Sequence, residues 1–156
     1  MGRQEWNVKR EQPDVPEIAF DGESIRLCNS GKEVWQVPLS EVRAIGEYTN
    51  ENGPMWDDWY LVFVGREGNW YEVPADAPTV QPMLVLLSER LHAPLGLTLL
   101  RSTSLASAIL WPPRLRGGEF LSFNRVSRGS WLSRLLGSRR VEYALTKPVI
   151  DALNAS

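Results

Sequence analysis

The sequence predicts an α+β protein that is mostly β: a curved antiparallel sheet or barrel, one capping amphipathic helix, and a C-terminal extension ending in a short helix. Three observations lead to this fold class. Apolar runs of strand length, separated by turn-forming residues, fill residues 17–74. The apolar period then becomes helical over residues 79–92. The 156 residues also include seven Trp, four Tyr and four Phe, enough for one core without metals or disulfides.

A hairpin is expected at the start of the sheet. Residues 18–20 and 25–28 are short strand-like runs that flank Asp21-Gly22, a strong hairpin signal. A second turn then leads into a third strand at residues 34–37. The second strand carries the only cysteine of the chain, for which we expect a buried structural role.

Two longer strands follow, at residues 42–48 and 59–64. The first alternates, with Val42, Ala44, Gly46 and Tyr48 on one face and Arg43, Ile45 and Glu47 on the other. The second is apolar on both faces, which predicts a central position or a place in a closed sheet. A turn at residues 65–68 leads back into a strand at residues 70–74.

Residues 79–92 predict the amphipathic helix that caps the sheet. Their apolar side chains recur at helical spacing, and Pro82 falls in the first turn, where it is tolerated. Thr79 or Asp76 is the expected N-cap, and Pro94 with a following glycine ends the helix.

The remaining chain has weaker signals. Residues 97–100 and 119–123 are candidate strands, residues 104–111 form an apolar segment of undecided type, and residues 141–145 alternate as a strand does. A short helix is predicted from 147 to 154, capped by Thr146.

The order of antiparallel strands followed by one amphipathic helix resembles the pleckstrin-homology-like (PH-like) fold of small bacterial domains. The resemblance covers about residues 20–92 and rests on four segments: residues 37–45, 59–64, 69–74 and 79–91. Such domains bind phosphoinositides, peptides or other proteins, so the resemblance implies a binding function. The chain departs from the complete fold, which has seven strands before its helix, because six are predicted here.

The charge of the chain is divided, although its net value is only −2. Residues 1–83 hold 7 basic and 15 acidic side chains, whereas residues 84–156 hold 10 basic and 4 acidic ones. We therefore expect three parts: an N-terminal arm (residues 1–16), an acidic PH-like module (17–95) and a basic extension (96–156) that packs on the module as one compact unit.

No catalytic or cofactor-binding motif is found in the sequence. The single histidine, His92, is expected at the end of a helix, where a cation complements the helix dipole. One Cys and one His are too few for a zinc site, and no nucleotide-binding fingerprint is present. We therefore expect a protein without enzymatic activity, cofactor, metal or identified small-molecule substrate.

An acidic, Trp-containing loop is the first candidate binding site. Carboxylates beside indoles suit a cation or a basic peptide, and the alternative is a solvated strand entrance with core aromatics. The candidate partner-binding residues are Glu47, Glu51, Trp56, Asp57 and Asp58.

An arginine-rich segment, residues 114–140, is the second candidate. Arginine interleaved with aromatics suits phosphate or anionic lipid headgroups. Ordinary surface arginine gives the same pattern, and so does arginine that pairs with the acidic half of the same chain. The candidate anion- or lipid-binding residues are Arg128, Trp131, Arg134, Arg139 and Arg140.

Together these patterns predict a soluble, cytoplasmic binding or interaction domain whose partner is a protein. One alternative is a small immunity-type or regulatory protein that uses loop 47–58. Another is a domain that binds an anionic membrane surface or phosphoinositides through residues 114–140. Nucleic acid is disfavoured as a partner because the isoelectric point of the chain is near 5.5.

Overall fold

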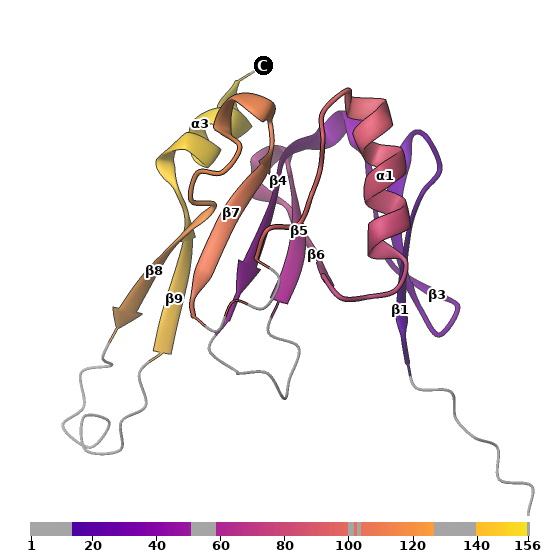
Figure 1. The fold of residues 1–156 in the computed structure, drawn as a ribbon, viewed down its shortest axis with the longest axis horizontal. Coiled ribbons are helices and arrows are strands. Elements are labelled where there is room, and N and C mark those ends of the chain that lie inside the picture. Colours follow the sequence, from indigo (N-terminus) through magenta and orange to yellow (C-terminus); the bar gives the residue numbers. More distant parts are fainter. Residues whose placement is uncertain (1–13, 51–58, 100–101, 103, 127–139, 156) are drawn as a thin grey trace, which may run out of the picture.

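The fold is α+β and mostly β, as the sequence predicts (Figure 1). This computed structural model describes residues 14–50, 59–99, 102, 104–126 and 140–155, with backbone alone for 124–126 and 140–142. Its strands are β1 (Pro16–Phe20), β2 (Ser24–Asn29), β3 (Lys32–Pro38), β4 (Val42–Thr49), β5 (Trp59–Gly65), β6 (Trp70–Pro74), β7 (Ala106–Trp111), β8 (Leu121–Val126) and β9 (Arg140–Leu145). Its α-helices are α1 (Val80–Leu91) and α3 (Lys147–Asn154).

The described strands form three antiparallel sheets rather than one closed barrel. The strand orders are β1-β2-β3, β6-β5-β4-β7 and β8-β9. β5 lies between β4 and β6, which confirms the central position expected from its apolar sequence. β7, which comes after the helix in the chain, pairs with β4 and forms an edge of the same sheet as β4–β6. The C-terminal extension therefore contributes a strand to the sheet of the preceding module.

The expected hairpin joins β1 to β2. The carboxylate of Asp21 accepts the backbone N–H groups of Glu23 and Ser24 at 2.9 and 2.7 Å. Gly22 has a φ of +102°, a conformation that favours glycine. Cys28, expected to be buried, is only half-buried near the end of β2.

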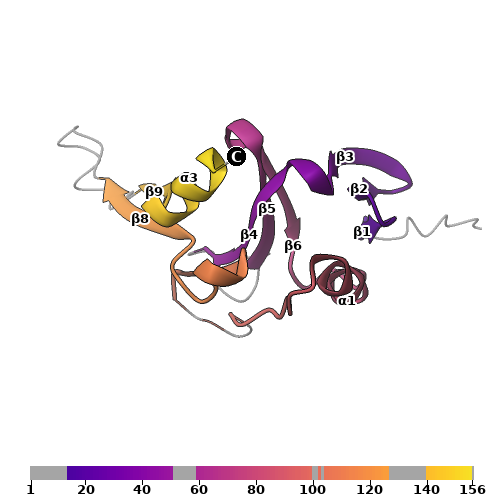
Figure 2. The same ribbon diagram turned by 90° about the horizontal axis from the view of Figure 1, so that it is seen from above.

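One face of the four-stranded sheet is covered by α1 and by the β1–β3 sheet (Figure 2). The apolar core on this side includes Val80, Met83, Leu84 and Leu87 of α1, which confirms the predicted amphipathic helix. Thr79 is the N-cap, but its hydroxyl oxygen accepts the N–H of Ile18 at 2.7 Å, so this side chain links the helix start to β1. His92 is the C-cap, at the helix end where the sequence places it.

The other face is covered by β8, β9 and α3 (Figure 2). The core on this side consists of Ala44, Val62, Val64, Ile109, Phe120, Leu121 and Val149. Ser107 of β7 connects the layers, because its hydroxyl accepts the N–H groups of Phe120 and Leu121 at 3.1 and 2.9 Å. Sheet pairing and apolar packing thus join the basic extension to the acidic module.

Charge pairing is not seen between these two halves in the described residues. Their single ion pair is local, since Lys147 Nζ lies 2.9 Å from Asp151 Oδ2 one turn later in α3. Both side chains are exposed, so this pair contributes little to stability.

A bulge in β4 changes the expected face of one residue. Val42 pairs with Gly65 and Ala44 pairs with Val64, so one extra residue, Arg43, is inserted between the two pairs. Val42 therefore joins the core beneath α1, whereas Ala44 joins the core beneath α3. The predicted alternation holds for the rest of the strand.

Two smaller expectations concern the segment after α1. Residues 97–99 have no regular secondary structure, so the candidate strand there is not formed. The undecided apolar segment contains β7, and α3 begins after Thr146, its predicted N-cap. None of the described helices is long and apolar enough to cross a membrane.

Candidate functional site

A groove of about 370 Å³ opens between the four-stranded sheet and the β8–β9 hairpin. Its lining combines three aromatic residues, two leucines and one carboxylate: Tyr48, Trp70, Glu72, Leu121, Tyr143 and Leu145. These residues come from β4, β6, β8 and β9. We call this feature the aromatic groove.

The alternation of β6 places two groove residues on one face. Trp70 and Glu72 are two positions apart, so both side chains stand on the side of the sheet that β8 and β9 cover. Across β5, Glu72 pairs with Val62, which in turn pairs with Gly46 of β4.

The carboxylate of Glu72 is held by two donors on one of its oxygens. The hydroxyl of Tyr48 donates to Glu72 Oε2 at 3.0 Å, and Trp70 Nε1 donates to the same oxygen at 2.8 Å. The backbone of Glu72 is also fixed, because its carbonyl oxygen accepts Trp35 Nε1 at 3.2 Å. No partner of Glu72 Oε1 is found among the described residues.

Aromatic rings surround Tyr48. Its centroid lies 5.3 Å from that of Tyr60, with the planes 20° apart, which is a stacked arrangement. Trp70 and Tyr143 lie at 6.1 and 5.7 Å, each inclined by 56° to the ring of Tyr48. Trp70 and Tyr143 keep 39% and 43% of their surface exposed, so the groove presents aromatic surface to solvent.

Burial raises the pKa of the Tyr48 hydroxyl well above its usual value, and the negative charge of Glu72 raises it further. The hydroxyl therefore stays protonated across the physiological pH range. It therefore remains a hydrogen-bond donor to Glu72 in this range.

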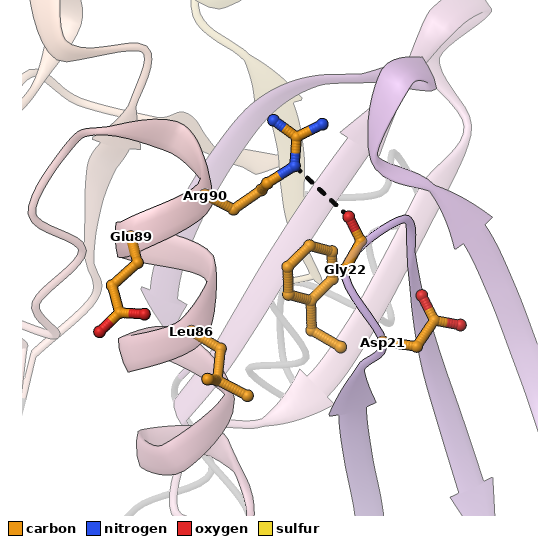
Figure 3. A pocket seen from close by; sticks show the side chains of 6 residues that line it. Asp21, Gly22, Leu86, Glu89 and Arg90 are labelled. Carbon is orange, nitrogen blue, oxygen red and sulfur yellow. Dashed lines mark hydrogen bonds between the residues drawn. The ribbon is translucent and has the colours of Figure 1, made fainter.

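A second pocket, of about 510 Å³, lies between α1 and the β1–β2 turn (Figure 3). It is lined by Phe20, Asp21, Gly22, Leu86, Glu89 and Arg90. Arg90 is turned toward the β1–β2 turn, where its Nε lies 3.4 Å from the carbonyl oxygen of Gly22 (Figure 3). The carboxylate of Asp21 is used in the turn itself, and the backbone N–H groups of Ser24 and Glu23 lower its pKa. This pocket mixes both signs of charge and its polar groups mainly hold the turn and helix together.

Glu47, a predicted partner-binding residue, lies in the interior and not on the surface. Its side chain has no exposed surface, which excludes it from a solvent-facing acidic rim. Oε1 accepts the backbone N–H and the hydroxyl of Thr98 at 2.6 and 2.7 Å. Oε2 accepts Trp59 Nε1 at 2.9 Å and the N–H of Leu99 at 3.3 Å. The carboxylate thus fastens the segment after α1 to the sheet.

The other predicted binding residues lie outside the part of the chain for which side chains are described. On the acidic side these are Glu51, Trp56, Asp57 and Asp58, and on the basic side Arg128, Trp131, Arg134 and Arg139. Arg140 begins β9, where the backbone alone is described. The acidic-loop site, apart from Glu47, and the arginine-rich site therefore stay predictions.

Sequence reasoning missed the aromatic groove because its residues are scattered along the chain. The available signal was the Trp70-x-Glu72 spacing within a strand, which puts an indole and a carboxylate on one face. Nothing local in the sequence indicates that Tyr48 and Tyr143 join them. Comparisons of the chain with protein-family models, with curated proteins and with solved structures give no match.

Proposed function

We propose that this chain is a non-catalytic binding domain that recognises a cationic group of a protein partner in the aromatic groove. The observation that carries the proposal is the position of the Glu72 carboxylate. It accepts hydrogen bonds from Tyr48 and Trp70 and lies beside aromatic rings of the groove. Among the six described residues that line the groove Glu72 alone carries a charge, so this lining complements a cation.

The aromatic surface supports the same ligand class. The faces of Trp and Tyr rings attract cations, most strongly where the cation loses water. Trp70 and Tyr143 provide partly exposed rings beside the carboxylate, and both are residue types that dominate binding energy at protein interfaces. Half-buried Leu145 adds an apolar surface for the carbon chain that carries the cation, whereas Leu121 lines the groove with almost no exposed surface.

The structure is compatible with a PH-like architecture for residues 20–92, which we retain as part of the proposal. Six antiparallel strands precede α1, which covers one face of the β4–β6 sheet and contacts β1. A domain of this type that binds a protein in the cytoplasm agrees with the single cysteine of the sequence.

Calorimetric titration with short glycine-flanked peptides tests the proposed function. One peptide carries lysine at its centre, a second arginine, and a third the neutral isostere norleucine. We expect at least one cationic peptide to bind and the neutral peptide not to bind. Equal binding of the neutral peptide, or no binding of either cationic peptide, contradicts the proposal.

Two matched variants locate the site. Glu72→Gln keeps the shape of the side chain but removes its charge, and we expect it to weaken binding about tenfold, equivalent to about 1.4 kcal/mol. Glu89→Gln removes the same charge from the second pocket and should leave the affinity unchanged. If Glu89→Gln weakened binding and Glu72→Gln did not, the binding site would lie in the second pocket and not in the aromatic groove.

A further inference from the structure

We infer that the aromatic groove selects an N-methylated lysine side chain, best in its dimethylated form, over arginine. This inference rests on the proposed function and names the class of cation that the groove takes. It follows from three features of the groove: the hydrogen bonds already made by Glu72, the inclination of the rings, and the apolar lining.

The hydrogen bonds of Glu72 disfavour the two-pronged contact that arginine makes with a carboxylate. Each carboxylate oxygen has about two acceptor sites, and Oε2 already accepts both Tyr48 Oη and Trp70 Nε1. A bidentate guanidinium needs a free site on each oxygen. Among the described residues Oε1 has no partner, so it is the oxygen that can accept a further N–H without displacing one, and the groove suits a ligand with one donor.

The rings disfavour the flat stacking that also stabilises arginine. A planar guanidinium stacks best between parallel faces. Here Tyr60 already stacks on Tyr48, and the rings of Trp70 and Tyr143 are each inclined by 56° to the ring of Tyr48. Inclined rings form a corner. A corner fits a tetrahedral methylammonium group better than it fits a planar guanidinium group.

The apolar lining determines the preferred number of methyl groups. Each added methyl replaces an N–H that would otherwise need an acceptor, and the lining instead offers apolar surface from half-buried Leu145 and from the exposed rings of Trp70 and Tyr143. A dimethylated lysine keeps one N–H for Glu72 Oε1, whereas a trimethylated lysine keeps none. The choline group of a lipid also lacks an N–H, and for this reason we assign the groove to a modified protein.

The test compares ligands on the wild-type chain by calorimetry. The glycine-flanked peptide carries unmodified, monomethylated, dimethylated or trimethylated lysine, or arginine, and phosphocholine is measured alongside. We expect dimethyl-lysine to bind most tightly and arginine about tenfold more weakly. Arginine binding as tightly as dimethyl-lysine overturns the inference but leaves the proposed function standing. If trimethyl-lysine or phosphocholine binds most tightly, the inference is likewise overturned, and if nothing binds, both proposals fail.

A variant tests the reason for the selectivity. Tyr48→Phe keeps the ring but frees one acceptor site on Glu72 Oε2, so the preference for dimethyl-lysine over arginine should narrow several-fold. Tyr71→Phe makes the same change on β6 outside the groove and should keep the wild-type preference. An unchanged ratio in Tyr48→Phe, with a thermal transition like that of the wild type, contradicts the hydrogen-bond argument.

Discussion

The ring of Phe120 occupies the space that a side chain at Gly46 would need. A Cβ at Gly46 would lie 2.3 Å from Phe120 Cδ2, closer than any such contact is tolerated. Phe120 is fully buried, and its ring lies 5.9 Å from that of Trp70. This close approach packs the segment before β8 onto β4 and supports the aromatic groove from beneath.

Gly46→Ala is therefore expected to destabilise the protein by about 1–3 kcal/mol, because Phe120 must leave its position in a filled core. Denaturant unfolding measures this change. Gly65→Ala is the matched control, since the nearest atoms to its new Cβ lie 3.5 Å away, an ordinary contact. Equal stability of Gly46→Ala and the control would mean that Phe120 is not held against β4.

Glu47→Gln should lower the free energy of unfolding by about 1–3 kcal/mol, since one acceptor oxygen becomes an amide that faces donors. Those donors are Trp59, Thr98 and Leu99, all directed at the buried carboxylate. Glu41→Gln makes the same change at an exposed position and serves as the control in denaturant titrations. A loss no larger than that of the control would show that this network does not fasten the segment after α1.

Ser107→Ala should also cost about 1–3 kcal/mol, because the N–H groups of Phe120 and Leu121 lose their acceptor. Hydrogen exchange of these two amides, together with the unfolding free energy, reports the effect. Ser104→Ala, at an exposed position, should leave both readouts unchanged. Undiminished protection of the two amides in Ser107→Ala would contradict the link between β7 and β8.

The turn at Asp21 predicts a dependence of stability on pH. The folded pKa of Asp21 lies below its ordinary value of 3.8, so its contribution is present above that value and is lost as the pH falls through the folded pKa. The wild type should therefore exceed Asp21→Asn in stability near neutral pH, and the two should converge in acid. Parallel stability curves from pH 7 to pH 2 would contradict this assignment.

Most of the fold is predictable because each element carries a local signal. β5 is apolar throughout, the Asp21-Gly22 pair marks a turn, and the helical period begins where α1 begins. The β4 bulge is different, since nothing in the sequence around Arg43 shows that it is the inserted residue. The pairing of β7 with β4 also depends on contacts between distant segments.

The candidate site was harder to predict for the same physical reason. A carboxylate near a strand end has the same sequence pattern whether it faces solvent or accepts internal donors. Glu47 and Glu72 illustrate the two cases, since Glu47 has no exposed surface and Glu72 stands in an open groove. Their difference is set by which face of the sheet the covering elements leave open, and that depends on tertiary packing.

The central claim is tested most directly by the indole N–H resonance of Trp70 in a two-dimensional nitrogen–proton spectrum, assigned with Trp70→Phe. This N–H donates to Glu72 Oε2 and so reports on the groove carboxylate. On titration with the dimethyl-lysine peptide, we predict a saturable shift of this resonance, while that of Trp35, bound to the backbone of Glu72, moves little. An unmoved Trp70 resonance at saturating peptide would contradict the account.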